Sequence, residues 1–223
     1  MADSPVGSRP RRSLLKSQAY QEIKDRIQDS TFAGGSFLSE RQLAALLGMS
    51  KTPIKAALER LEQEGFVTVS PQQGIVVREI TVQEIADQFE LRRVLEEYVV
   101  RQIAGKLTTA QLSTLERNLR HQQNAVEKSS VKRITRLDTE FHVVLCQSLG
   151  NEAILESLMQ HRSRMHRVIH QVMVAAPGRL ATAYEEHLGI FEAIRDGKPD
   201  LAARRLNQHL DFGERFMLSN RGR

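Results

Sequence analysis

The chain has no tryptophan, a single cysteine and no long run of apolar residues. Cys146 alone cannot form an intramolecular disulfide, and its apolar helical surroundings indicate a buried structural thiol in a reducing compartment. Because no stretch of about 18 apolar residues exists, the sequence predicts no membrane-spanning helix. The arginines near the N-terminus are not followed by the apolar segment of a secretory signal. Aromatic residues make up only 5% of the chain, so we expect a cytoplasmic, mainly α-helical protein.

The segment 39–67 carries the most informative pattern. Ser39 begins a capping-box spacing that predicts a helix from Glu40. Gly48 marks a turn after it, and Ser50 is suited to cap a second helix. Two short helices joined by a tight turn are the arrangement that places a helix in the DNA major groove. Their apolar faces are expected to consist of Leu43, Leu46, Leu47, Ile54, Ala57, Leu58 and Leu61.

The second of these helices is followed by a hairpin pattern. Two β-branched, apolar runs at 66–69 and 75–77 flank a turn that contains Gly74. A helix–turn–helix followed by a hairpin predicts a winged helix, whose tip reaches the minor groove or the DNA backbone. The alternative is a small helical domain with a solvated charged face. The polar, cationic and wing-tip residues expected to contact DNA are Ser50, Lys51, Thr52, Lys55, Gln73 and Gly74.

The rest of the chain predicts an all-α domain. A second capping spacing at Thr81 opens a series of about six helices, and no strand pattern follows. The predicted fold is therefore an N-terminal winged helix–turn–helix domain with a C-terminal helical bundle. The predicted boundaries are a disordered basic tail over 1–13, the winged-helix domain over 14–78, a linker over 79–81, the helical domain over 82–217 and a tail over 218–223.

One aspartate and three histidines of the helical domain have spacings that could bring them together. Asp138 and His142 are four residues apart on one helix face. Lys198 lies in the predicted turn of a helical hairpin. His187 precedes it by 11 residues and His209 follows it by 11 residues, so the two histidines are expected at the same height of the hairpin. This set could bind a divalent metal ion such as Zn²⁺, Ni²⁺ or Mn²⁺. The alternative is that each is an ordinary buried polar side chain.

A second group of histidines lies among arginines on one predicted helix. Its surroundings favour a polar or interfacial helix, or part of an anion-binding wall, over a metal site. The group consists of His161, His166 and His170 with Arg162, Arg164 and Arg167.

The motifs resemble those of a known family. Residues 17–78, with LSERQLAALLGMSKTPIKAALERLEQEGFV, resemble the winged-helix domain of the GntR family of bacterial transcription regulators. Residues 81–215 resemble the FCD effector domain of the FadR-like subfamily, in the segments FELRRVLEEYVVRQIA, LDTEFHVVL, YEEHLGIFEAI and LAARRLNQHL. The resemblance implies a homodimer that binds a short palindromic operator, most often as a repressor. It also implies a small organic acid bound in a cavity next to a metal ion.

The resemblance also implies roles for individual residues. Arg92 matches an arginine that faces the acid, although a surface ion pair with Glu96 is an equally good interpretation. Arg41 matches a DNA-binding arginine. Lys51 and Lys55 stand where many relatives have arginine, so the operator sequence need not be that of the relatives. The implied metal ligands are Asp138, His142, His187 and His209.

Two other functions fit the same residues. A metalloenzyme could use Asp138 and the histidines to activate water, with Glu140 or Glu186 as the general base. No nucleophile or oxyanion motif accompanies them. A metal sensor, in which the ion itself is the signal, is the other alternative.

Overall fold

The computed structural model describes residues 9–70, 74–176 and 178–221, and the chain divides into two compact units, Met1–Ile80 and Thr81–Arg223. In the described ranges, no helix has the length and apolar character needed to cross a membrane. The elements of the first unit are α1 (Arg9–Gln28), β1 (Phe37–Leu38), α2 (Glu40–Leu47), α3 (Lys51–Gln63), β2 (Val67–Ser70) and β3 (Gly74–Val77).

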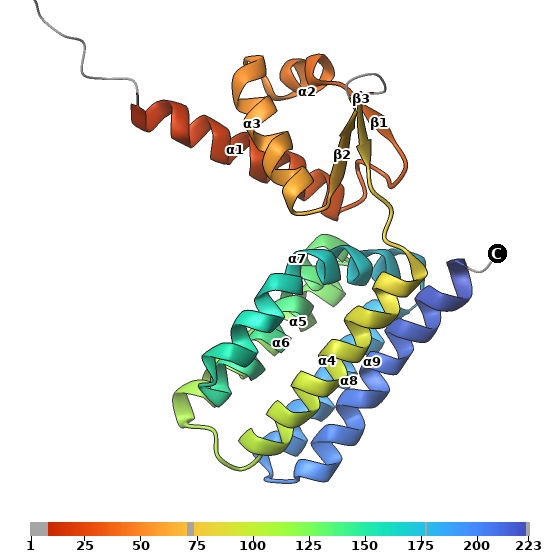
Figure 1. Ribbon diagram of the computed structural model, residues 1–223. Coiled ribbons are helices and arrows are strands. Elements are labelled where there is room, and N and C mark those ends of the chain that lie inside the picture. The colour runs from red at the N-terminus through yellow and green to blue at the C-terminus, as the bar shows by residue number, and fades with distance from the viewer. Residues whose placement is uncertain (1–8, 71–73, 177, 222–223) are drawn as a thin grey trace, which may run out of the picture. The chain divides into compact units, whose positions relative to one another are not determined.

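The first unit is a winged helix. Helix α1 packs against α3, and the three strands form an antiparallel sheet in the order β1-β3-β2 (Figure 1). The predicted hairpin is confirmed by the pairing of β2 with β3. Strand β1 was not predicted, because two residues are too few to show an alternating pattern. The core is formed by apolar side chains of all three helices and the sheet, among them Ile23, Ile27, Leu43, Ile54, Leu58, Leu61, Phe66 and Val77.

The predicted helix start at Glu40 is confirmed. The Ser39 hydroxyl accepts the Gln42 N–H at 3.2 Å, as an N-cap does. Gly48 ends α2 with φ at 63°, a left-handed conformation that glycine adopts without strain. The expectation that Leu46 faces the core is wrong, since its side chain is 56% exposed. Helix α2 has only eight residues, and Leu43 supplies its buried contact.

The structure contradicts part of the prediction made for residues 1–13. Helix α1 begins at Arg9, so the prediction of a disordered tail over 1–13 is wrong for 9–13. Pro10 lies in the first turn of this helix. Backbone N–H groups there have no partner within the helix, so proline, which lacks an N–H, breaks no hydrogen bond. At the other end, α9 continues to Arg221, beyond the predicted boundary at 217.

The second unit is a helical bundle, as predicted. Within the described residues it contains α4 (Val82–Ile103), α5 (Thr109–Glu127), α6 (Val131–Leu149), α7 (Glu152–Ala175), α8 (Arg179–Arg195) and α9 (Pro199–Arg221). Helix α9 packs against α4 and α8, and α6 packs against α5 and α7 (Figure 1). The predicted capping box at the start of α4 is confirmed: the Thr81 hydroxyl accepts the Glu84 N–H, and the Glu84 carboxylate accepts the Thr81 N–H.

Two glycines hold the α8–α9 hairpin against the end of α4. Gly105 has φ at +71° and donates its N–H to the Ile194 carbonyl at 2.8 Å. A Cβ at Gly105 would lie 3.1 Å from the Gly197 Cα, closer than side-chain carbons normally approach backbone. The close approach therefore requires glycine, and it helps to fix the hairpin that carries His187 and His209.

Candidate functional site

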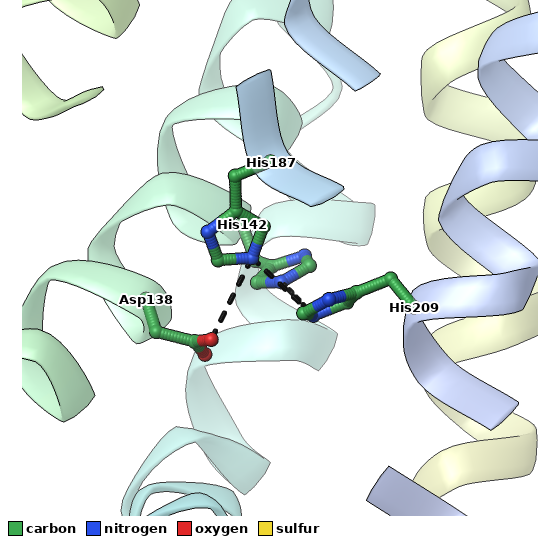
Figure 2. Close-up of side chains that lie close together, drawn as sticks. All are labelled: Asp138, His142, His187 and His209. Carbon is green, nitrogen blue, oxygen red and sulfur yellow. Dashed lines mark hydrogen bonds and ion pairs between the residues drawn. The ribbon is translucent and has the colours of Figure 1, made fainter. Parts of the chain in front are cut away.

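The aspartate and three histidines singled out in the sequence come together inside the bundle. Helix α6 carries Asp138 and His142, α8 carries His187 and α9 carries His209 (Figure 2). All four side chains are at most 5% exposed. One possible ligand atom from each lies within 4.8 Å of the others, and no other group of this kind occurs among the described residues.

The distances between these atoms fit a tetrahedral metal site. The His209 Nε2 lies 3.2 Å from the His142 Nε2 and 3.3 Å from the His187 Nε2, and the His187 Nε2 lies 3.5 Å from the Asp138 Oδ1. Ligands about 2.1 Å from a tetrahedral ion are separated by about 3.4 Å. These three distances are close to the spacing that such an ion requires, and all four donor atoms lie within 4.8 Å of one another.

Hydrogen bonds to the Nδ1 atom of each histidine determine which ring nitrogen carries the proton and which one can bind a metal ion. The His142 Nδ1 lies 2.5 Å from a Glu96 carboxylate oxygen, and the His187 Nδ1 lies 2.9 Å from the Gln122 amide oxygen. These oxygens can only accept, so each Nδ1 carries the proton and each Nε2 presents a lone pair to the centre.

His209 follows the same rule. Its Nδ1 lies 2.7 Å from a Glu186 carboxylate oxygen and 3.2 Å from the Arg179 guanidinium. Because arginine can only donate, the carboxylate is the hydrogen-bond partner and Nδ1 again carries the proton. Three Nε2 lone pairs therefore face one point, an arrangement that a cation stabilises and that is repulsive without one.

Burial shifts the pKa values of the cluster in a direction that favours the binding of a cation. It holds the pKa of His187 and of His209 well below the ordinary value, so both rings are neutral and able to ligate. It also raises the pKa of Asp138, and the Asp138 Oδ2 has no hydrogen-bond partner. A divalent ion would favour the charged carboxylate and occupy the lone pairs, so the donor set fits a divalent metal.

Arg92 forms the predicted ion pair with Glu96, but the pair is not at the surface. The Arg92 Nε donates to the Glu96 Oε1 at 2.7 Å, and the two residues are 5% and 0% exposed. Burial by itself would raise the pKa of Glu96, but the charge of Arg92 and the hydrogen bonds from Arg92 and His142 outweigh it and lower this pKa to about 2. Glu96 thus connects Arg92 to a histidine of the cluster.

Two small cavities lie beside the cluster, each of about 20 Å³, which is room for about one water molecule. Arg92 and Ile169 line both of them. The first lies among α4, α6 and α7 and includes His142, and the second includes Asp138, His209 and Arg179.

Sequence reasoning missed the roles of Gln122 and Arg179, because their partners are distant along the chain and no local pattern marks them. Glu186 was considered only as a general base. In the structure its carboxylate is bound to Arg179 and His209, and Glu140 is exposed on the outside of α6.

The second histidine group does not form a metal site among the described residues. His161 bonds the Gln88 amide at 2.9 Å, and His166 lies 3.3 Å from the Thr139 hydroxyl. Arg162 lines the first cavity with His161, a position compatible with the predicted anion-binding wall. Cys146 is fully buried, and burial raises the pKa of its thiol, as expected of a structural cysteine.

The residues expected to contact DNA lie mostly on the surface of the winged helix. Gly74 begins β3 with φ at +83°, and a Cβ there would lie 3.2 Å from the Leu38 carbonyl oxygen, so the backbone alone requires glycine. Gln73 lies outside the described residues. The exposed residues are Arg41 on α2, Ser50 at the N-cap position of α3, and Lys51, Thr52 and Lys55 on α3.

Comparisons with known proteins agree with both halves of the architecture. The model of bacterial regulatory proteins, gntR family, matches residues 15–77, and the FCD domain model matches residues 87–212. The HTH-type transcriptional repressor RspR of Escherichia coli strain K12 is 27% identical over 88% of this chain and 86% of that protein. The Nta operon transcriptional regulator of Aminobacter aminovorans is 31% identical over 80% of this chain and 83% of that protein.

The same fold is found in solved structures. The E. coli protein McbR/YncC is similar with a TM-score of 0.76 at 23% identity, over 94% of this chain and 99% of that chain. The matched families and the named relatives are regulators of transcription, not enzymes.

Proposed function

The chain belongs to the GntR family of bacterial transcription regulators and carries an FCD domain, and from this premise we propose that it is a repressor controlled by a small organic acid. The acid would bind in the FCD domain beside a divalent metal ion and change the affinity of the protein for its operator. The observation that carries this proposal is the convergence of Asp138 with three histidine Nε2 lone pairs in a buried cluster. A cluster of this kind, inside a domain attached to a DNA-binding unit, supports a regulatory ligand site.

The DNA contacts would come from the exposed N-terminal side of α3, from Arg41 and from the wing. Cationic and hydroxyl side chains at the start of a recognition helix suit phosphates and base edges. A homodimer would present two such helices to a palindromic operator with half-sites about one helical turn apart. The proposed DNA-binding residues are Arg41, Ser50, Lys51, Thr52, Lys55, Gln73 and Gly74.

The proposed metal ligands are Asp138, His142, His187 and His209. Such an ion would supply a fixed positive charge where a carboxylate can bind. The donor set suits Zn²⁺, Ni²⁺ or Mn²⁺, and elemental analysis of the purified protein identifies the ion.

Arg92 is the proposed contact to the acid. It lines both cavities beside the cluster and is held by Glu96. Since each cavity has room for about one water molecule, an acid must displace side chains in order to bind. That displacement would change the packing of the bundle and so alter operator affinity, provided that the acid binds the two states differently.

The test measures DNA binding by fluorescence anisotropy. Zinc-loaded protein is titrated against the DNA upstream of its own gene, with and without a panel of small mono- and dicarboxylates. We expect at least one acid to change the affinity about tenfold or more. His187→Gln should lose both the metal and this response while it still binds DNA.

The alternative functions give different results. An affinity that stays constant across the panel but follows the free metal concentration would identify a metal sensor. An affinity that responds to neither acid nor metal would refute regulation through the cluster.

A further inference from the structure

Arg179 lines the same cavity as Arg92, next to the histidine cluster. It is 3% exposed, and it lines the second cavity together with Arg92, Asp138 and His209. Its two Nη groups bind both carboxylate oxygens of Glu186, at 2.9 and 2.8 Å. Its Nε is buried and has no hydrogen-bond partner.

Arg179 pairs with Glu186 and its guanidinium lies 4.2 Å from the centre of the Phe212 ring, but two features of its position are unfavourable for folding. It is the first residue of α8, where the helix dipole disfavours a cation. A buried N–H without a partner also costs free energy. A cation held in such a place, with an unused donor beside a cavity, is suited to binding an anion.

The two arginines are connected to the cluster in the same way. Each binds a glutamate, and each of these glutamates accepts the Nδ1 proton of a different histidine. The third histidine, His187, differs because its Nδ1 is bound by the neutral amide of Gln122 and not by a glutamate that is paired with an arginine. The two series of contacts are Arg92–Glu96–His142 and Arg179–Glu186–His209.

Charge and lining define the class of ligand. With a divalent ion present, the ion and the two arginines carry four positive charges, and Asp138, Glu96 and Glu186 carry three negative ones. One carboxylate would therefore neutralise the buried cluster, whereas two would leave a buried negative charge, which is expensive. The remaining wall of the second cavity is apolar, formed by Phe89, Ile169, Val172, Met173 and Leu210.

We infer that Arg179 is a second acid-binding residue, which holds with Arg92 the carboxylate of a small monocarboxylic acid that has an apolar body. This inference rests on the proposed function. In it, Arg179 contacts the acid, and Glu186 serves mainly to orient His209.

The experiment measures butanoate, succinate and Zn²⁺ binding to the full-length protein by calorimetry. Arg179→Gln should weaken butanoate binding to the zinc-loaded protein about 10- to 100-fold, as expected for a lost bond to a charged group. It should not weaken Zn²⁺ binding, because Glu186 remains to accept from His209. Arg179→Lys keeps the positive charge but cannot form the bidentate hydrogen bonds of a guanidinium, so its butanoate affinity should lie between those of the wild-type protein and Arg179→Gln.

Two further variants separate binding from folding. Glu186→Gln should weaken Zn²⁺ binding about 10- to 100-fold, and more than it weakens butanoate binding at saturating Zn²⁺. Arg93→Gln removes an arginine one position from Arg92 that pairs with Asp211 and Glu214 on α9. It should change neither affinity, and thermal melting checks that each variant is folded.

The outcomes distinguish this inference from the proposed function. Unchanged butanoate binding in Arg179→Gln, or an equal loss of butanoate and Zn²⁺ binding, overturns the role of Arg179 while the proposed function stands. Tighter binding of succinate than of butanoate overturns the ligand class. If the wild-type protein binds neither acid, this inference fails, whereas the proposed function fails only if no acid of the panel changes operator affinity.

Discussion

The two units of this protein differ in where their polar and charged side chains lie. In the winged helix, the buried side chains of the described residues are apolar except for the hydroxyl of Tyr20, and the proposed DNA contacts are exposed. In the bundle, fourteen polar or charged residues are buried among those that the structure describes, including Arg92, Glu96, Asp138 and Arg179.

The difference follows from the ligand that each unit is proposed to bind. DNA is large and highly charged, so a surface can bind it and a simple apolar core suffices behind that surface. A small acid has few atoms and gains affinity mainly from contacts in a site shielded from water. The bundle therefore has to hold charges inside, and each must be paired to be tolerated.

Glu96→Ala gives the strongest test of this contrast. It leaves the buried guanidinium of Arg92 without its partner, so we expect the free energy of unfolding of the metal-free protein to fall by about 3–5 kcal/mol. Urea denaturation measures it. The control is Asp200→Ala, which breaks the exposed pair with Arg101 and should cost at most about 1 kcal/mol. Equal losses would mean that burial does not distinguish the two pairs.

Zinc should stabilise one unit only. At a free Zn²⁺ concentration 100 times its Kd, binding adds about 2.7 kcal/mol to the stability of the bundle. Hydrogen exchange should slow in α6, α8 and α9 and stay unchanged in α1 and α3. His187→Gln should abolish the effect. Slower exchange throughout both units would show that they unfold together.

Lys51→Ala tests the exposed surface. We expect operator affinity to fall about tenfold, or about 1.4 kcal/mol, as for the loss of one specific contact. The free energy of unfolding should change by less than about 0.5 kcal/mol, because the side chain is exposed. Lys106→Ala, an exposed lysine in the bundle unit, should leave both quantities unchanged. DNA binding that survives Lys51→Ala intact would remove this residue from the proposed interface.

The smallest expected effect is on the stability of the winged helix, when Glu64 is replaced by Gln. Burial would raise its pKa, but hydrogen bonds from Lys24 and Tyr20 lower it below the ordinary value. The charged form therefore stabilises α1 against α3 above the ordinary pKa, and this contribution is lost as the pH falls through the folded-state pKa. Glu64→Gln should cost about 1 kcal/mol at pH 7 and less as the pH is lowered. A difference that stays constant from pH 7 to pH 3 would contradict this assignment.

Most of the fold could be predicted because its signals are local. Capping residues at Ser39 and Thr81, the glycine at 48 and the helical spacing of apolar residues each act within a few positions of the chain. Strand β1 could not be predicted, since its two residues are defined only by their partners Val76 and Ile75 on β3. The four converging residues were predictable because Asp138 and His142 share one turn and the other two share one hairpin.

The sequence by itself determined the two-part architecture, the winged helix, the helical bundle and which four side chains could meet. Only the tertiary structure decided what surrounds them. Glu96 reaches His142 across 46 positions and Gln122 reaches His187 across 65, distances along the chain at which no spacing rule applies. The pairing of Arg92 with Glu96 was visible in the sequence, but its burial was not, because burial depends on the helices that pack around it. That burial separates a weak surface ion pair from a charge network able to support a ligand site.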